Sequence, residues 1–374
     1  MTDAPGKLTF AAGRSSLGQY GRAGVDALGS MQVFASSALR DAAERAFDAD
    51  ADGRALHEGP AGDAGAAEIM EWVERATEVA NRHGSYRWER FFQGYVARAI
   101  YDFGIPAVEA RRDHFPVPPA PAQADAGEAA EGAPALPDYF ERDWHLRPGG
   151  WDAYDLYGPH GLHVIGPIFR LGGFAAVPVG AEIGRHRIDV ASQLPRRDYR
   201  RIYEPGCGNA TTLIALRSVF PEAALVGSDL SLEQLRGARM LLQRFGVEAD
   251  LRHRDATSSG EADGSFDAVA IFALNHELPV ETSIALFREM YRILAPGGDI
   301  VISDPPPFRA VGPFHAALLH WDTANRGEPY FSDAGAADWA RELAAIGFVD
   351  VAARPLGPAS YPWVTIARKP ARGR

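Results

Sequence analysis

The residue types best suited to a ligand-binding turn lie at 203–211, which read Tyr-Glu-Pro-Gly-Cys-Gly-Asn-Ala-Thr. Gly206 and Gly208 allow the backbone to turn tightly and to lie close to a ligand. Glu204 adds a carboxylate where a short apolar run ends, and an amphipathic helical pattern follows over 209–220. A strand, a tight turn and a helix in this order form the nucleotide crevice of a doubly wound α/β sheet.

The charge at this turn favours a cationic ligand. In the dinucleotide pattern G-x-G-x-x-G a pyrophosphate lies on the helix N-terminus, but here Thr211 occupies the third glycine position. The Glu204 carboxylate would also repel a pyrophosphate. S-adenosylmethionine (SAM) carries a sulfonium and an ammonium and no phosphate, so it suits this charge. A nicotinamide-binding domain is the alternative, and nucleotide titration separates the two.

Two more carboxylates follow the next apolar runs. Asp229 comes at a second predicted strand end, where a carboxylate can bind both ribose hydroxyls. Asp255 comes at a third, where a side chain can hydrogen-bond the adenine amino group. The continuously apolar run at 266–272 is typical of a buried parallel strand. The other expected cofactor contacts are Cys207, Leu230, Ala256 and Phe272.

With these motifs in order, residues 197–370 resemble a class I SAM-dependent methyltransferase. The motifs are Glu204-Pro-Gly-Cys-Gly-Asn-Ala, Gly227-Ser-Asp-Leu, Arg254-Asp-Ala, Phe266-Asp-Ala-Val, and Leu294-Ala-Pro-Gly-Gly followed by Ile300-Val-Ile-Ser-Asp. The resemblance implies a Rossmann-like, seven-stranded, doubly wound sheet with one antiparallel strand, and SAM as cofactor. Ala210 departs from the usual third glycine, and we expect a slightly tighter turn with the site intact.

His276 is the candidate general base, because methyl transfer to a hydroxyl requires removal of a proton. It follows the fourth apolar run and resembles the histidine of the His-Asp-Trp region in small-molecule O-methyltransferases, although Leu278 replaces the tryptophan. The residues leave two alternatives open. One is an N- or S-methyltransferase that acts by proximity without a base. The other is a SAM-binding protein without catalysis.

The acceptor pocket is less well defined by the sequence. Asp304 ends the fifth predicted strand and would either orient the acceptor or cap a turn. A long insertion, predicted as a loop, extends from there to Ser332, and loops of such length are usually functional. The aromatic stripe at 86–101 would form either an acceptor wall or plain core. The expected acceptor contacts are Asn275, Asp304, His320 and Trp321.

Composition narrows the class of protein. The chain has 374 residues, 46% hydrophobic and 23% charged, which is ordinary for a soluble globular protein. The net charge of −11 argues against nucleic acid or an acidic membrane as partner. No run is apolar enough to span a bilayer, and the single cysteine forms no internal disulfide. We therefore expect a cytoplasmic enzyme acting on a small molecule, as a possible homodimer.

The predicted organisation has four parts: a helical N-terminal domain at 1–114, a Pro/Ala-rich linker at 115–137, a connecting or lid segment at 138–195, and the methyltransferase domain at 196–374. No metal site is predicted. The calcium-like Asp48-x-Asp50-x-Asp52 has Gly59 where a bidentate glutamate is needed. The pair at 160 and 163, His-x-x-His, has no further ligand beside it in the sequence.

Overall fold

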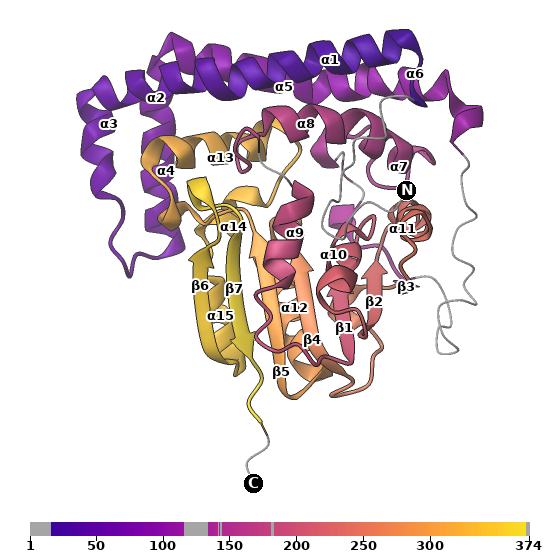
Figure 1. The fold of residues 1–374 in the computed structure, drawn as a ribbon. Helices are drawn as coiled ribbons and strands as arrows, with labels where there is room; N and C mark the ends of the chain where they lie inside the picture. Colours follow the sequence, from indigo (N-terminus) through magenta and orange to yellow (C-terminus); the bar gives the residue numbers. More distant parts are fainter. Residues whose placement is uncertain (1–15, 116–133, 141, 143, 181–182, 372–374) are drawn as a thin grey trace.

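The computed structural model describes residues 16–115, 134–140, 142, 144–180 and 183–371. These residues form a twisted sheet with helices on both faces and a layer of long helices across one end (Figure 1). Most of the predicted linker, residues 116–133, lies outside the described part of the chain. The domain boundaries drawn from the sequence remain predictions.

Seven strands form one sheet in the order β3-β2-β1-β4-β5-β7-β6. The strands β1 to β5 are parallel, and β7 is antiparallel to both of its neighbours. The strand order reverses between β1 and β4, which is where open α/β sheets bind ligands. The α/β fold class and the single antiparallel strand predicted from the sequence are confirmed. The strands are β1 Arg201–Pro205, β2 Ala224–Asp229, β3 Asp250–His253, β4 Phe266–Phe272, β5 Leu294–Asp304, β6 Val349–Pro355 and β7 Trp363–Arg368.

Each face of the sheet buries its own apolar cluster because successive strand residues point to opposite faces. In β1, Ile202 packs toward α9, α10 and α11, whereas Tyr203 packs toward α12 and α15. Both clusters lie beneath the carboxyl ends of the parallel strands and hold those ends in place. The helices are α9 Ile183–Ala191, α10 Thr211–Val219, α11 Leu232–Phe245, α12 Val280–Ile293 and α15 Trp339–Ile346.

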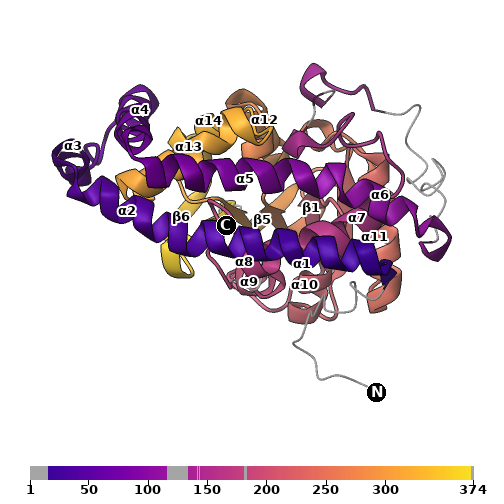
Figure 2. The same cartoon turned by 90° about the horizontal axis from the view of Figure 1, so that it is seen from above.

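The helical layer lies across the carboxyl ends of the parallel strands. Seen from above, α1, η3 and α2 form one long rod beside α5 (Figure 2). The first described helix, α1, begins at Gln19, and its Val25 and Leu28 are buried in the cluster shared with α8. The layer comprises α1 Gln19–Phe34, η3 Ala35–Leu39, α2 Arg40–Ala49, α3 Ala51–Ala55, η4 Leu56–Glu58, α4 Ala66–Arg82, α5 Gly84–Asp102, α6 Gly104–Glu109 and η5 Arg112–His114.

The insertion after Asp304 is helical, which corrects the prediction of a long loop. It contains η12 Phe308–Ala310, α13 Pro313–Asn325 and α14 Phe331–Ala336. Small and apolar side chains of α13 are fully buried against α4, so the insertion belongs to a packed core. The helix α15 follows α14 closely, and Asp338 caps α15 by accepting a hydrogen bond from the Arg341 amide at 3.1 Å.

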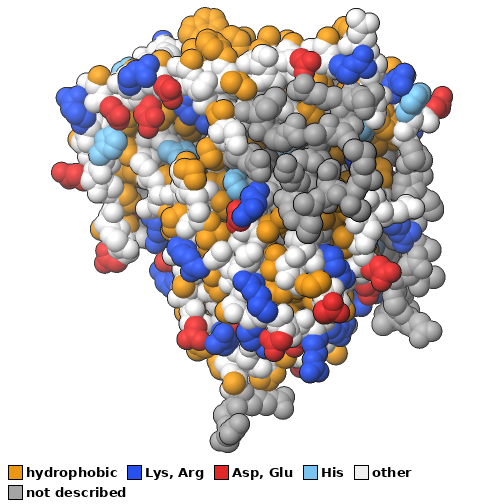
Figure 3. All heavy atoms as spheres, in the orientation of Figure 1, with side chains coloured by type: hydrophobic (Ala, Val, Ile, Leu, Met, Phe, Trp, Pro, Cys, Tyr) orange, Lys and Arg blue, Asp and Glu red, His pale blue; other side chains and the backbone are white. Residues whose placement is uncertain are grey.

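The outer surface of the helical layer carries exposed aromatic side chains. Hydrophobic atoms gather along the upper edge of the space-filling view, over the helical layer (Figure 3). The exposed aromatic residues are Tyr20, Phe34, Trp88, Phe91 and Tyr95, all on α1 and α5. Within the described residues, no helix is long and apolar enough to cross a membrane. The homodimer expected from the sequence remains a prediction.

Candidate active site

The glycine turn after β1 adopts backbone conformations that favour glycine. Gly206 and Gly208 have φ of +59° and +50°. A Cβ atom on Gly206 would lie 2.6 Å from a methyl carbon of Leu274, so only glycine fits there without movement. Ala210 also lies in the left-handed region, at φ +64° and ψ +19°, and begins α10. Ala210 therefore takes the place of the usual glycine at the cost of backbone strain.

Asp229 and Asp255 both accept hydrogen bonds from backbone amides of the turns at the carboxyl ends of the strands. The Asp229 carboxylate accepts hydrogen bonds from the amides of Gly208 and Ser231, both at 2.8 Å. Asp255 accepts one from the Thr257 amide at 2.8 Å. The two carboxylates line one cavity of about 270 Å³. The same cavity is lined by Glu204, Gly206, Cys207, Gly208, Leu230, Ala256 and Phe272, the other residues expected to contact the cofactor.

An acidic and a basic side chain both line this cofactor cavity. Burial raises the pKa of Glu204 to about 8, and its Oε2 has no hydrogen-bond partner. Arg187 of α9 lines the same cavity, with its guanidinium 4.3 Å from the centre of the Phe272 ring. An acid and a base side by side suit a ligand that carries both an ammonium and a carboxylate. No sequence pattern pointed to Arg187, which comes from outside the motifs.

The segment before the sheet covers the cofactor cavity with aromatic rings. Tyr139 and Phe140 of η7 Asp138–Phe140, Trp144 of η8 Trp144–Leu146, and Trp151 all line it. Asp152 fixes this roof to the start of α11 by accepting hydrogen bonds from Ser231 Oγ at 2.5 Å and from the Glu233 amide at 3.2 Å. This position is compatible with the lid role expected for 138–195, which stays a prediction.

A second cavity of about 360 Å³ adjoins the first, and we call it the acceptor cavity. The two cavities share four lining residues, Trp151, Phe272, Ala273 and Glu277, which therefore mark the boundary between them. Much of the remaining wall is apolar and comes from the helical layer and the segment before the sheet. These apolar residues include Ile100, Tyr101, Ile165, Phe169, Phe174 and Phe331.

His276 and Asp304 form a hydrogen-bonded pair in the wall of the acceptor cavity. His276 lies on η11 Asn275–Glu277, just after β4, and Asp304 ends β5. Their Nδ1 and Oδ1 atoms are 2.5 Å apart, and the Nε2 of His276 is 3.5 Å from Glu277 Oε1. Burial alone would lower the pKa of His276, but the two carboxylates outweigh it and raise that pKa well above 6.5. Adjacent parallel strands bring the pair together.

A second histidine bridges two carboxylates beside this pair. His145 is 2.8 Å from Glu277 through Nε2 and 2.6 Å from Glu328 through Nδ1. Although burial opposes the charge, the two carboxylates raise the pKa of His145 well above 6.5. These three residues are the one group in the described chain whose geometry could hold a metal ion. Because both ring nitrogens already contact carboxylates, an imidazolium bridge accounts for the group without a metal.

Three residues expected to bind the acceptor do not line its cavity, which corrects those expectations. Asn275 is fully buried and lines neither cavity. His320 is hydrogen-bonded to Ser332 Oγ at 2.7 Å, and Trp321 lines an outer groove beside α5. The reason is helical geometry. In α13 the side chain of Asp322 faces the cavity, and residues one and two positions earlier point about 100° and 200° away.

The aromatic stripe of α5 divides between the interior and the surface. Tyr86 and Tyr101 are buried, whereas Trp88, Phe91 and Tyr95 are about half exposed or more. Of these five, Tyr101 alone lines the acceptor cavity. Neither alternative weighed from the sequence describes the whole stripe, because a helix of 19 residues presents aromatic side chains on several sides.

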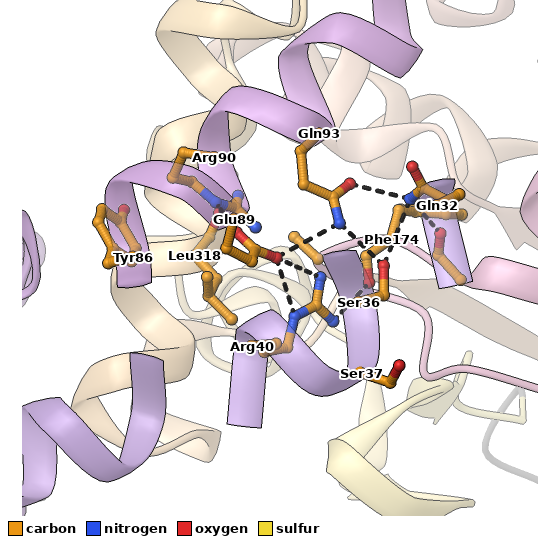
Figure 4. Close-up of polar contacts among 12 residues, drawn as sticks. Gln32, Ser36, Ser37, Arg40, Tyr86, Glu89, Arg90, Gln93, Phe174 and Leu318 are labelled. Atoms are coloured by element: carbon orange, nitrogen blue, oxygen red, sulfur yellow. Dashed lines mark hydrogen bonds and ion pairs between the residues drawn. The ribbon is translucent and has the colours of Figure 1, made fainter. Parts of the chain in front are cut away.

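A buried polar network fastens the helical layer above the acceptor cavity (Figure 4). Glu89 pairs with Arg40 at 3.2 Å and also with Arg90. Arg40 in turn donates to the Phe174 carbonyl at 3.3 Å. In the same network Gln32 donates to the Gly173 carbonyl at 2.7 Å. The loop that places Phe174 in the cavity wall is thus held by side chains of the long helices.

Comparisons with known proteins bear on the sheet domain. Residues 202–298 match the model of a family described as "Methyltransferase domain". A demethylmenaquinone methyltransferase from Thermus thermophilus is 32% identical over 34% of this chain and 57% of its own length. A ubiquinone biosynthesis O-methyltransferase from Dinoroseobacter shibae is 32% identical over 41% of this chain and 57% of its own. The chain thus spans little more than half the length of these relatives.

The solved structure of an O-methyltransferase family protein from Burkholderia thailandensis is 16% identical to this chain. It covers 51% of this chain and 58% of its own, with a TM-score of 0.41.

Proposed function

We propose that this chain, whose sheet domain is a class I SAM-dependent methyltransferase with SAM as its cofactor, transfers a methyl group to a hydroxyl of a small molecule. The relatives named above support methyl transfer to a small molecule, since one is named a demethylmenaquinone methyltransferase and the other a ubiquinone biosynthesis O-methyltransferase. The cavity residues fit SAM: an acidic and a basic side chain at Glu204 and Arg187, carboxylates at two strand ends, and an aromatic roof. When bound, SAM supplies the methyl group.

The hydrogen-bonded pair of His276 and Asp304 is the observation that carries the proposal of O-methylation. Asp304 accepts from Nδ1 and so leaves Nε2 of a neutral imidazole as the proton acceptor. That nitrogen faces Glu277, which lines both cavities and so stands at the boundary where the acceptor hydroxyl must lie. We infer that His276 removes the hydroxyl proton and that Asp304 orients the ring and stabilises the imidazolium.

Replacing the histidine tests this proposal. His276→Ala should lower kcat by about 10²–10⁴-fold while the Kd for SAM stays within about threefold, because a general base acts on the acceptor proton and not on the cofactor. His57→Ala, a surface histidine near α3, is the control and should keep full turnover. Turnover of His276→Ala within threefold of wild type would instead support N- or S-methylation by proximity.

The pH profile gives an independent test. A base must be unprotonated, and carboxylates raise the pKa of His276 above 6.5. We expect kcat/KM to rise with pH through a limb above pH 6.5 and the limb to vanish in His276→Ala. A profile flat from pH 6 to 9 would contradict the proposed base.

Acceptor and catalysis are best identified together, with SAM bearing a trideuterated methyl group. Purified protein, labelled SAM and small-molecule extracts are incubated and analysed by mass spectrometry. A labelled ether product establishes O-methylation, and a label on nitrogen or sulfur contradicts it. No labelled product from any extract, with S-adenosylhomocysteine still bound, would favour a SAM-binding protein without catalysis.

A further inference from the structure

An arginine in the acceptor cavity has no anionic partner in the described part of the chain. Arg147 is 9% exposed and lines that cavity. Its guanidinium lies 4.4 Å from the ring centres of both Trp151 and Tyr157. Its Nε and Nη1 atoms are buried and make no hydrogen bond. The rings stabilise the faces of the guanidinium, but they leave its N–H groups without acceptors.

The unpaired charge of Arg147 differs in kind from a buried carboxyl group nearby. Asp322 also lines the cavity, and its Oδ1 accepts no hydrogen bond, although it is 4.0 Å from Arg90 Nη1. Burial raises the pKa of Asp322 to about 6. A buried carboxyl can therefore escape its charge by taking up a proton. An arginine has no such escape, because it keeps its proton in proteins. A buried, unpaired cation is strongly unfavourable, so a ligand anion is its natural partner.

The anion belongs to the acceptor and not to the cofactor. Arg147 lines the acceptor cavity and is not in the wall of the cofactor cavity, which has its own arginine, Arg187. Trp151, on which Arg147 stacks, lies at the boundary of the two cavities. A group bound to Arg147 is therefore within the chamber that opens onto the point of transfer.

The other arginine of this cavity differs from Arg147. Arg326 stacks on Phe169 at 5.2 Å, and none of its side-chain nitrogens is buried without a hydrogen bond. Arg147, in contrast, has two buried nitrogens without a hydrogen bond, and it pairs with no acid among the described residues. The cation that lacks a partner in this cavity is therefore Arg147.

We infer that the acceptor is a small organic acid whose carboxylate binds Arg147 and whose apolar or aromatic body fills the rest of the cavity. This inference rests on the proposed function, since it assigns the second cavity to the acceptor. The carboxylate serves recognition, and the hydroxyl of the same molecule lies toward His276. Aromatic side chains such as Tyr101, Phe169 and Phe331 favour a flat hydrophobic body.

Matched neutral and anionic probes test the inference without turnover. Calorimetry measures binding of 4-hydroxycinnamate, 3-phenylpropionate and benzoate, each against its primary amide, to protein saturated with S-adenosylhomocysteine. We expect at least one acid to bind about tenfold or more tightly than its amide. Arg147→Met should weaken that acid by about 10–100-fold and leave the amide unchanged. Arg147→Lys should retain part of the preference, and Arg185→Met, an exposed arginine of α9, should retain all of it.

Thermal melting of the ligand-free proteins distinguishes recognition from structural stacking. If Arg147 is reserved for a ligand, Arg147→Met should melt at or above the wild-type temperature, because a buried unpaired charge has been removed. A melting temperature several degrees lower would mean that stacking on Trp151 and Tyr157 is the role of this arginine, and would overturn the inference.

Two further results would also overturn it. One is equal binding of acid and amide in every pair, or no binding of any acid. The other is a labelled product, from the trideuterated-methyl experiment, whose acceptor carries no anionic group. The protein could instead fail to transfer a methyl group and still prefer acids to amides through Arg147. That result would contradict the proposed function but not the role of Arg147 in binding an anion.

Discussion

Two buried charge clusters in this protein show how differently the same side chains are used. In the helical layer, the carboxylate of Glu89 is fully buried and paired with both Arg40 and Arg90. In the acceptor cavity, Arg147 has no acid partner among the described residues, and Glu277 and Glu328 each leave one oxygen without a hydrogen bond. In the first cluster each charged side chain has a partner of opposite charge, although Arg90 Nη2 makes no hydrogen bond; in the second, Arg147 has no such partner among the described residues.

The paired cluster therefore suits a role in stability, and the unpaired charges suit a role in binding a ligand. A buried charge with a partner costs little net free energy, but removal of that partner is strongly destabilising. Charges left unmatched in a cavity lower stability in the ligand-free protein, and binding of a ligand can offset that cost. The matched cluster holds the roof of the acceptor cavity, and the unmatched groups face the chamber beneath it.

The largest effect is expected in the matched cluster. Glu89→Gln would remove the carboxylate that pairs with both Arg40 and Arg90, so the free energy of unfolding should fall by about 3–5 kcal/mol. Denaturant unfolding measures it. Arg147→Met is the control from the acceptor cavity, and its free energy of unfolding should be no lower than that of wild type. A loss below about 1 kcal/mol for Glu89→Gln would remove the distinction between the two clusters.

Stability should also depend on the bridging histidine. The pKa of His145 is higher in the folded than in the unfolded protein, so its contribution is full below pH 6.5 and is lost as pH rises through the folded pKa. A tenfold gain in proton affinity on folding corresponds to about 1.4 kcal/mol. We expect His145→Gln to be less stable than wild type by on the order of 1–2 kcal/mol at pH 6, and the gap to narrow toward pH 10.

Denaturant unfolding of both proteins across this pH range isolates the histidine, because the other titrating groups are common to the two. A gap that is constant from pH 6 to 10 would show that the bridge with Glu277 and Glu328 carries no proton-linked stability.

The affinity for SAM should depend on the ionisation of the Glu204 carboxyl group. Burial raises the pKa of Glu204 to about 8, and the charged form suits the ammonium of SAM. The Kd for SAM should therefore fall by on the order of tenfold as pH rises from 6.5 to 8.5. Glu204→Gln should bind weakly at both values, and calorimetry compares them. An equal pH dependence in the variant would assign the effect to another group.

The smallest effect concerns backbone strain. Ala210 is an L-residue in the left-handed region at the start of α10. Ala210→Gly should relieve about 1–2 kcal/mol of strain and lose part of that gain to unfolded-chain entropy, for a net stabilisation of about 0.5–1 kcal/mol. Ala215→Gly, in the interior of the same helix, is the control and should be destabilising. Destabilisation by both changes would exclude strain at Ala210.

Patterns in the amino-acid sequence predicted the sheet and the carboxylates that line the cofactor cavity. Local signals sufficed there: apolar runs of strand length, glycines where φ is positive, and carboxylates at strand ends. Because parallel strands end at one edge of a sheet, Glu204, Asp229 and Asp255 had to meet once the fold was right. His276 and Asp304 followed by the same reasoning from neighbouring strands.

The wall of the acceptor cavity depends on contacts that form only in the folded chain. The helical insertion after Asp304 looked like a loop, and the rotation of α13 turned Asp322 toward the cavity in place of His320 and Trp321. Arg147 and Arg187 stand outside every motif, and a sequence does not show whether an arginine has a partner. Pairing of charges between segments far apart in the chain is settled by packing, which no local pattern of residues records.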